Sequence, residues 1–326
     1  MDFLLGADSS AQKLAVMVVA ILLFVVVMTA LLLVSELPKM PRWLVIIAFL
    51  GPTVLLILFG LVYPAISTIL GSFKSGNQQE WVGIENYTAV FTNPELRTVL
   101  LNTALWVVLV PLLSTVFGLV YAVIVDRSPF EKQAKALVFL PMAISMVGAG
   151  IIWKFVYDYK PTTRPQTGLM NQVLVWLGFE SQQFLLNWPS NTFFLIVVMV
   201  WIQSGFAMTI LSAAIKAIPD DIIEAAKLDG ASQMRMFASV TVPSIRPALV
   251  VVLTTISMTT LKVFDIVYSM TGGNFRTSIV ANEFYIQSFR TGQRGIGATL
   301  AVLLFVIIVP LVVYNIRQMK LSEEQR

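Results

Sequence analysis

The sequence contains no cysteine and no histidine, and charged side chains are scarce. Without Cys and His, disulfide scaffolds, thiolate nucleophiles, Cys/His zinc sites and the serine–histidine triad are excluded. Only 12% of the 326 residues are charged, whereas 57% are hydrophobic; an average soluble domain is about 25% charged. No soluble core needs so much apolar surface, so the composition indicates an integral membrane protein. The net charge of +4 fits basic membrane loops and implies no nucleic-acid partner.

Long apolar runs recur along the chain, and a bilayer-spanning helix needs about 20 such residues. They predict seven transmembrane helices, at residues 14–34, 43–70, 99–125, 135–157, 192–217, 249–270 and 296–316. The first run is too long for a cleavable signal peptide, so we interpret it as a retained helix. Pro52 and Pro64 predict a kink in the second.

Basic residues are slightly more frequent in one set of alternating loops, namely 35–42, 126–136, 216–248 and 317–326. The positive-inside rule therefore places these loops and the C-terminus in the cytoplasm and the N-terminus outside. The outer loop 158–191 contains an amphipathic stretch, 168–178, with a glycine at each end. This stretch predicts either a short surface helix or an ordinary ordered loop.

The longest cytoplasmic loop, here called the EAA segment, covers residues 218–247 and reads IPDDIIEAAKLDGASQMRMFASVTVPSIRP. Asp221 and Glu224 have the spacing of a capping box that opens a helix. Gly230 is expected to end this helix about two turns later, and Ser232 to cap a second one. The two prolines further on indicate re-entry into the bilayer. We expect a short helix in the membrane plane, exposed to the cytoplasm, with or without a partner.

This segment resembles the EAA motif of permease subunits in binding-protein-dependent ABC importers. The matching positions are Glu224, Ala225, Ala226, Asp229, Gly230, Ala231, Phe237, Pro243 and Pro247. In that family the loop is the coupling helix, which sits in a cleft of the cytoplasmic ATPase. The run 264–273 is also similar to the maltose and alpha-glucoside branch of sugar permeases. It departs from that branch at Asn274, where a third glycine often follows.

The resemblance implies an all-α polytopic fold, a six-span type I ABC importer permease core with one extra N-terminal span. Its domains would be an N-terminal helix and linker (1–42), the permease domain (43–316) and a cytoplasmic tail (317–326). The chain would import a carbohydrate, an oligosaccharide or alpha-glucoside, across a bacterial or archaeal inner membrane. Its partners would be a second homologous permease, an ABC ATPase dimer and an extracytoplasmic sugar-binding protein.

No phosphate-binding G-x-x-x-x-G-K-[S/T] loop occurs in the sequence. A partner subunit must therefore bind ATP and Mg²⁺, so the chain itself is expected to hold no cofactor or metal and to be no enzyme.

Ionisable residues inside the spans are candidates for the translocation path. Lys262 and Asp265 lie three residues apart in the sixth predicted span, on one helical face. Pairing would offset part of the cost of about 3 kcal/mol for a charge at mid-bilayer. The pair either lines the path or is structural. Gln203 and Tyr268 are further path candidates, although polar groups in spans often only join helices.

Two other classes of function stay open. An ion-coupled secondary transporter uses ionisable residues at the membrane midplane, and only Lys262 and Asp265 could serve. It would leave the EAA segment unexplained. A membrane hydrolase or scaffold is disfavoured, because the predicted spans contain no pair of carboxylates.

Overall fold

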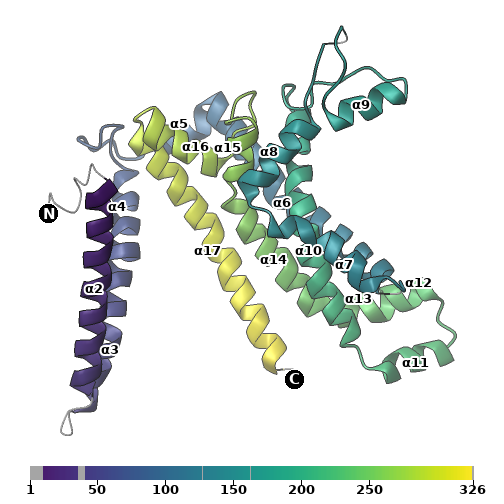
Figure 1. Cartoon of the computed structure of the whole chain (residues 1–326), viewed down its shortest axis with the longest axis horizontal. Helices are drawn as coiled ribbons and strands as arrows, with labels where there is room; N and C mark the ends of the chain where they lie inside the picture. Colours follow the sequence, from purple (N-terminus) through teal and green to yellow (C-terminus); the bar gives the residue numbers. More distant parts are fainter. Residues whose placement is uncertain (1–9, 36–40, 127, 162, 325–326) are drawn as a thin grey trace. The chain divides into compact units, whose positions relative to one another are not determined.

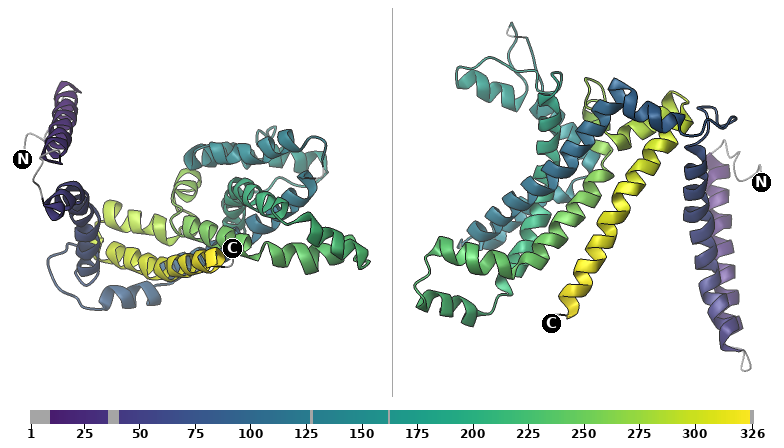
Figure 2. Two further views of the ribbon diagram at one scale, coloured as in Figure 1. Left: turned by 90° about the horizontal axis from the view of Figure 1, so that it is seen from below. Right: turned by 180° about the vertical axis from the view of Figure 1, so that it is seen from behind.

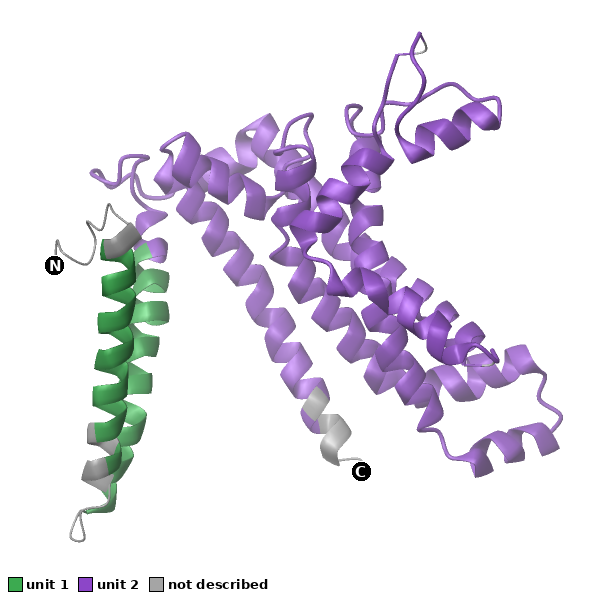
Figure 3. Cartoon of the chain, viewed as in Figure 1, with its two compact units in different colours: residues 1–67 green, residues 68–326 purple. Residues whose placement is uncertain are grey.

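The computed structural model describes residues 10–126, 128–161 and 163–324 except for 36–40 (Figure 1). Throughout these residues the regular elements are helices, apart from one isolated β-bridge between Lys74 and Trp81. The chain forms two compact units, residues 1–67 and 68–326 (Figure 3). The predicted all-α class is confirmed.

The first unit contains α2 (Ser10–Ser35), α3 (Arg42–Ile57), the π-helical turn η1 (Leu58–Val62) and the start of α4 (Tyr63–Gly71). The apolar windows of both membrane-length helices in this region have no residue buried within the chain. Each of these helices thus exposes its own apolar side chains on all sides, as expected for a membrane span. The irregularity predicted from Pro64 takes the form of the π-helical turn that precedes it.

The second unit is built around four long helices: α6 (Pro94–Val125), α10 (Ser190–Lys216), α14 (Arg246–Leu261) and α17 (Arg294–Glu324). α6 begins at Asn93, whose side chain accepts hydrogen bonds from the amides of Glu95 and Leu96, and Pro94 follows as the first helical residue. α6 packs most extensively on α10, and α14 packs on α6 and α17. Trp106, Leu195 and Met208 are among the fully buried side chains of the core.

Small residues allow the close approach of α6 and α10. Ser114, Gly118 and Ala122 are spaced four apart on α6 and are all buried. A Cβ added at Gly118 would lie 2.4 Å from the Cβ of Ala207 and 2.7 Å from the amide nitrogen of Met208. Neither atom is the end of a flexible side chain, so the two helices would have to separate.

We therefore expect Gly118→Leu to destabilise the folded protein by about 1–3 kcal/mol, the usual cost of overpacking. Thermal unfolding in detergent, followed by circular dichroism, measures the loss. Gly51→Leu on α3 is the control, because its nearest neighbour is the Ile47 Cγ2 at 3.9 Å. Equal melting temperatures for the two variants would contradict the close packing of α6 on α10.

The fourth predicted span is not one straight helix. It consists of α7 (Glu131–Phe139) with the 3₁₀ turn η2 (Leu140–Ala143), and α8 (Met146–Val156), which bend by 102°. Two local features cause the break: Pro141 follows α7, and Ser145 caps α8 by accepting from the Gly148 amide. The prediction of a single span at 135–157 was wrong in this respect.

The sixth predicted span is also divided. α14 ends at Leu261, and α15 (Asp265–Met270) is a separate short helix. Lys262 is the C-terminal cap of the first helix, and Asp265 opens the second. Past α15 the chain continues through α16 (Val280–Tyr285) and the π-helical turn η4 (Ile286–Arg290) into α17.

Five described helices are long and apolar enough to cross a membrane, and the number reaches seven if each of two bent pairs counts as one span. The second bent pair joins residues 233–244 to α14 at 68°. α17 extends to Glu324, into the segment predicted as a tail. The boundaries at residues 42 and 316 stay predictions.

Opposite ends of α10 carry the two long connections (Figures 1 and 2). At its N-terminal end lies α9 (Leu169–Trp176), bounded by Gly168 and by Gly178 in a left-handed conformation, so the stretch forms a short helix; its place on the membrane surface stays a prediction. Buried Asn171 fixes this region by donating to the carbonyls of Asp158 and Gln182 at 2.8 and 3.1 Å. A hydrogen bond from Thr167, assisted by Lys160, lowers the pKa of the Asp158 carboxyl.

Candidate functional site

The first helix of the EAA segment is α11 (Asp220–Leu228), which begins four residues after the end of α10 at Lys216. The predicted capping box is absent from this described helix. α11 starts after Pro219, which lacks a capping side chain, so Asp221 lies inside the first turn. Asp220 and Asp221 stabilise that turn through the helix dipole instead.

The end of α11 is where the sequence placed it. Gly230 adopts φ +75°, and the amide of Ala231 donates to the carbonyl of Ala226 at 3.1 Å. These are the features of a Schellman motif, in which glycine takes the left-handed position without a steric penalty. Ser232 then caps α12 (Gln233–Met236) by accepting from the amide of Arg235, as predicted.

The matched EAA residues form a largely exposed surface. Exposed positions are Glu224, Ala225, Asp229, Gly230, Pro243 and Pro247, whereas Ala226, Ala231 and Phe237 are half-buried. Three large apolar side chains of the segment are exposed as well: Ile222 by 45%, Met234 by 76% and Leu228 by 89%. Sequence reasoning missed Leu228 and Met234, although large apolar residues in a loop rich in charged side chains are a usable signal.

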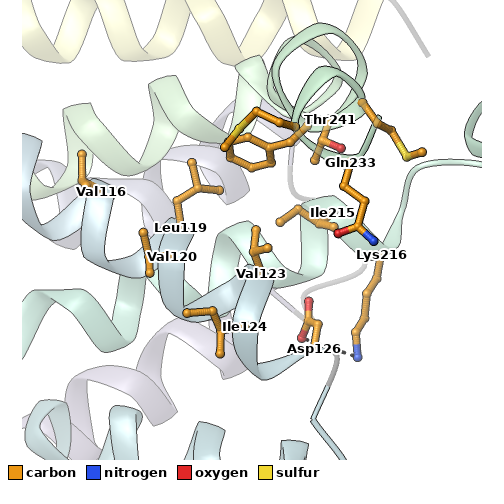
Figure 4. A pocket seen from close by; sticks show the side chains of 13 residues that line it. Val116, Leu119, Val120, Val123, Ile124, Asp126, Ile215, Lys216, Gln233 and Thr241 are labelled. Atoms are coloured by element: carbon orange, nitrogen blue, oxygen red, sulfur yellow. Dashed lines mark ion pairs between the residues drawn. The ribbon is translucent and has the colours of Figure 1, made fainter. Parts of the chain in front are cut away.

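The second half of the segment turns back toward the membrane helices. It contains the π-helical turn η3 (Phe237–Thr241) and α13 (Val242–Ser244), and Pro243 and Pro247 each stand at the start of a helical element. Phe237 lines a cavity of about 710 Å³ (Figure 4). One wall is the apolar face of α6 around Leu119, and Asp126 and Lys216 lie at its edge.

Gln203 lines a different cavity, of about 260 Å³, formed by α10, α14 and the bend between η2 and α8. Its side chain is 7% exposed and forms no hydrogen bond with another described residue. Thr255, Thr259 and Phe206 line the cavity as well, and the Thr259 hydroxyl donates to the Thr255 carbonyl at 3.0 Å. Hydroxyl and amide groups beside an aromatic ring are suited to a small polyhydroxylated ligand.

Lys262 and Asp265 do not share a helical face, because the helix breaks between them. No ion pair joins these two described side chains, so the pairing expected from their spacing is wrong. Lys262 lines a largely apolar groove with Phe264 and Tyr285. The structure therefore keeps Lys262 and Gln203 in separate cavities.

Tyr268 belongs to an aromatic cluster. Its ring stacks on Phe264 at a centroid distance of 4.8 Å, and its hydroxyl accepts from Arg290 Nη2 at 2.9 Å. The Arg290 guanidinium also lies over the Tyr268 ring, 5.4 Å from its centroid. Both the ring and the hydroxyl are thus engaged within the chain.

Residues 87–319 match the family described as "Binding-protein-dependent transport system inner membrane component". The chain belongs to this family. It is therefore a multi-pass inner-membrane component of a transport system, and the family is one of transport proteins rather than enzymes.

Named relatives of this transport component are sugar and osmolyte permeases. The osmoprotective compounds uptake permease protein GgtC of Synechocystis is 44% identical over 85% of this chain and 100% of its own length. The alpha-glucoside transport system permease protein AglF of Rhizobium meliloti is 44% identical over 82% of this chain and 80% of its own. The trehalose/maltose transport system permease protein MalF of Thermococcus litoralis is 32% identical over 71% of this chain and 77% of its own length.

Among solved structures, the transport component resembles a bacterial ABC transporter involved in importing the acidic polysaccharide alginate. The TM-score is 0.70 at 23% identity, over 87% of this chain and 96% of that one. This likeness confirms the fold of an ABC importer permease. Together with the relatives, it supports the interpretation as an importer permease over that of an ion-coupled secondary transporter.

Proposed function

We propose that this chain is the permease subunit of an ATP-driven importer for an oligosaccharide or alpha-glucoside. It forms half of the translocation path and docks on a separate ATPase through the EAA segment. The observation that carries this proposal is the exposed α11, with Leu228 89% exposed and its end fixed by Gly230. Ile222 and Met234 of the segment are exposed as well, and exposed apolar patches rimmed by polar residues are typical of protein contacts. The substrate class is supported by the alpha-glucoside and trehalose/maltose relatives.

The complete transporter would contain a second homologous permease, two ATPase subunits that bind ATP and Mg²⁺, and an extracytoplasmic sugar-binding protein. One EAA segment supplies one docking element, so an ATPase dimer calls for a second permease chain. A binding protein is supported by the family description.

Uptake into proteoliposomes tests the proposed function. The purified complex should accumulate at least one carbohydrate from a panel of disaccharides and alpha-glucosides, and only when ATP and the binding protein are present. Accumulation driven by a proton or sodium gradient without ATP would instead support the ion-coupled alternative.

The orientation follows from the docking role, which puts the EAA segment and the C-terminus in the cytoplasm. The natural chain has no cysteine, so single cysteines report topology without background. We expect Asp221→Cys to react with an impermeant maleimide only after the membrane is opened, and Glu180→Cys to react in intact spheroplasts. Both side chains are exposed. The reverse pattern would overturn the orientation.

Gln203 is proposed to bind the sugar during transport, because its buried amide faces the cavity without a partner in the described chain. Gln203→Leu should weaken sugar binding by about 1 kcal/mol, the net worth of a hydrogen bond. The half-saturating sugar concentration for uptake should rise about fivefold.

Thr209→Val is the control for Gln203→Leu. It lies on the same helix, and its hydroxyl donates to the Gly205 carbonyl instead of facing the cavity. If the half-saturating concentration rises equally in both variants, Gln203 has no special role in the path.

A further inference from the structure

A cluster of charged and polar side chains joins the adjacent ends of α6, α7 and α10. We call Asp126, Glu131, Lys135, Ser212 and Lys216 the ion-pair cluster. Lys135 Nζ lies 2.6 Å from Asp126 Oδ1 and 2.7 Å from Glu131 Oε1, and it donates to Ser212 Oγ at 2.6 Å. Lys216 pairs with Glu131 and lies 3.8 Å from Asp126 Oδ1 (Figure 4 shows Asp126 and Lys216).

The cluster is more than a set of surface ion pairs. The Asp126 side chain is 11% exposed and that of Lys135 26%, and Ser212 Oγ lies 2.8 and 2.9 Å from the two Asp126 carboxylate oxygens. Removing one member of a partly buried, hydrogen-bonded network leaves the others unpaired, and this is far costlier than losing an exposed pair. The network therefore fixes α7 to the end of α10.

A second contact holds α7 on the same helix. A Cβ added at Gly205 of α10 would lie 2.5 Å from the Val138 carbonyl oxygen and 3.0 Å from the Phe139 Cα. The backbones thus pack directly against each other at the end of α7. Gly205 and Ser212 are about 10 Å apart along α10, so both ends of α7 are attached to one stretch of that helix.

This stretch connects the two candidate sites. Lys216 is the last residue of α10, and α11 begins at Asp220. At its other end α7 continues into η2 and the 102° bend, where Met142, Ile144 and Met146 form one wall of the Gln203 cavity. Beyond the bend, α8 packs chiefly on α15. α10 itself carries Gln203, and α7 links the end of α10 that precedes α11 to the cavity wall formed by Met142, Ile144 and Met146.

We propose that the ion-pair cluster makes α7 and the α11 end of α10 move as one body, so that displacement of α11 reaches the sugar cavity through the bend at Ile144 and Ser145. The inference rests on the proposed docking of α11 to an ATPase. Asp126 and Lys216 are positioning residues in this scheme, and neither contacts the sugar. Loss of the cluster lets α11 and α10 move with the ATPase while the cavity wall formed by Met142, Ile144 and Met146 stays behind.

The first test is Asp126→Asn in the reconstituted transporter. The amide keeps the shape and an acceptor for Ser212 but removes the charge that pairs with Lys135 and Lys216. We expect ATPase co-purification and basal ATP hydrolysis within twofold of the unaltered protein, and at least a tenfold fall in sugar imported per ATP hydrolysed. Lys132→Gln, at an exposed position on α7 outside the ion-pair cluster, is the control and should change neither. An unchanged ratio in Asp126→Asn would overturn the proposal.

A second test does not depend on how Asp126→Asn folds. Glu131→Cys and Lys216→Cys are combined, and the only two thiols in the chain are joined by a short bis-maleimide. Uptake per ATP should be reduced before cross-linking and restored after it, because the link replaces the ion pair. Loss of uptake on cross-linking would overturn the proposal, because α7 and α10 would then have to separate. Co-purification of the ATPase with the unaltered chain is measured separately. If the unaltered chain does not retain the ATPase, the proposed docking role is refuted, and not the role of the ion-pair cluster.

Discussion

Gly230→Val is expected to abolish ATP-driven sugar uptake while the protein still reaches the membrane at normal abundance. Gly230 has φ +75° and no neighbour within 4 Å of an added Cβ, so the penalty is conformational, about 1–2 kcal/mol. That is small against a total stability of about 5–15 kcal/mol. This penalty is large enough to shift the end of α11. The shift also changes the direction of the chain between α11 and α12. Uptake by proteoliposomes and co-purification of the ATPase measure the effect.

Gly178→Val is a matched control for this variant. Gly178 follows the surface helix α9, has φ +82° and likewise has nothing within 4 Å of an added Cβ. The same strain at this position should leave ATPase retention and uptake intact. Gly230→Asn should keep partial activity, because asparagine tolerates the left-handed conformation. Normal uptake in Gly230→Val would refute the assignment of residues 221–231 as the docking element.

Leu228→Asp should weaken ATPase binding about 30-fold. The side chain is 89% exposed, and burying a leucine in an interface is worth about 2 kcal/mol. Because Leu228 makes so little contact within the chain, the free permease should melt at an unchanged temperature. Titration of the detergent-solubilised permease with ATPase subunits, followed by pull-down, gives the affinity.

The control for Leu228→Asp is Leu177→Asp. Leu177 is 66% exposed and is the C-terminal cap of a short helix, α9, at the opposite end of α10, whereas Leu228 is the last residue of α11. An affinity that falls equally in both variants would point to a general effect of charge. An unchanged affinity in Leu228→Asp would remove this residue from the docking surface.

Local sequence features predicted local structure well. Gly230 and Ser232 mark the ends of short helices through backbone and capping chemistry that involves only neighbouring residues. The capping box failed because the N-cap of α11 is Pro219, two residues before Asp221. Apolar runs located the membrane helices but not the 102° bend. The number of consecutive apolar residues indicates that a segment can lie in the membrane, but it does not indicate the direction in which the helix runs.

Contacts between distant segments could not be predicted. Lys262 and Asp265 suggested a pair by their spacing, but a break in the helix separates them. Asp126 and Ser212 are 86 residues apart, and the local sequence around each residue does not predict their contact. The exposure of single side chains could not be predicted either. Helical periodicity alone does not show that Leu228 makes little contact with the rest of its own chain.

Site-directed photo-crosslinking from position 228 tests the central claim most directly. A photoreactive phenylalanine analogue replaces Leu228 in the complete transporter, in native membranes, and a second protein carries the same analogue at Leu177. Illumination should join position 228, and not position 177, to the ATPase subunit. Adducts of position 228 with lipid or the sugar-binding protein alone, or an equal yield of ATPase adduct from position 177, would contradict ATPase docking through α11.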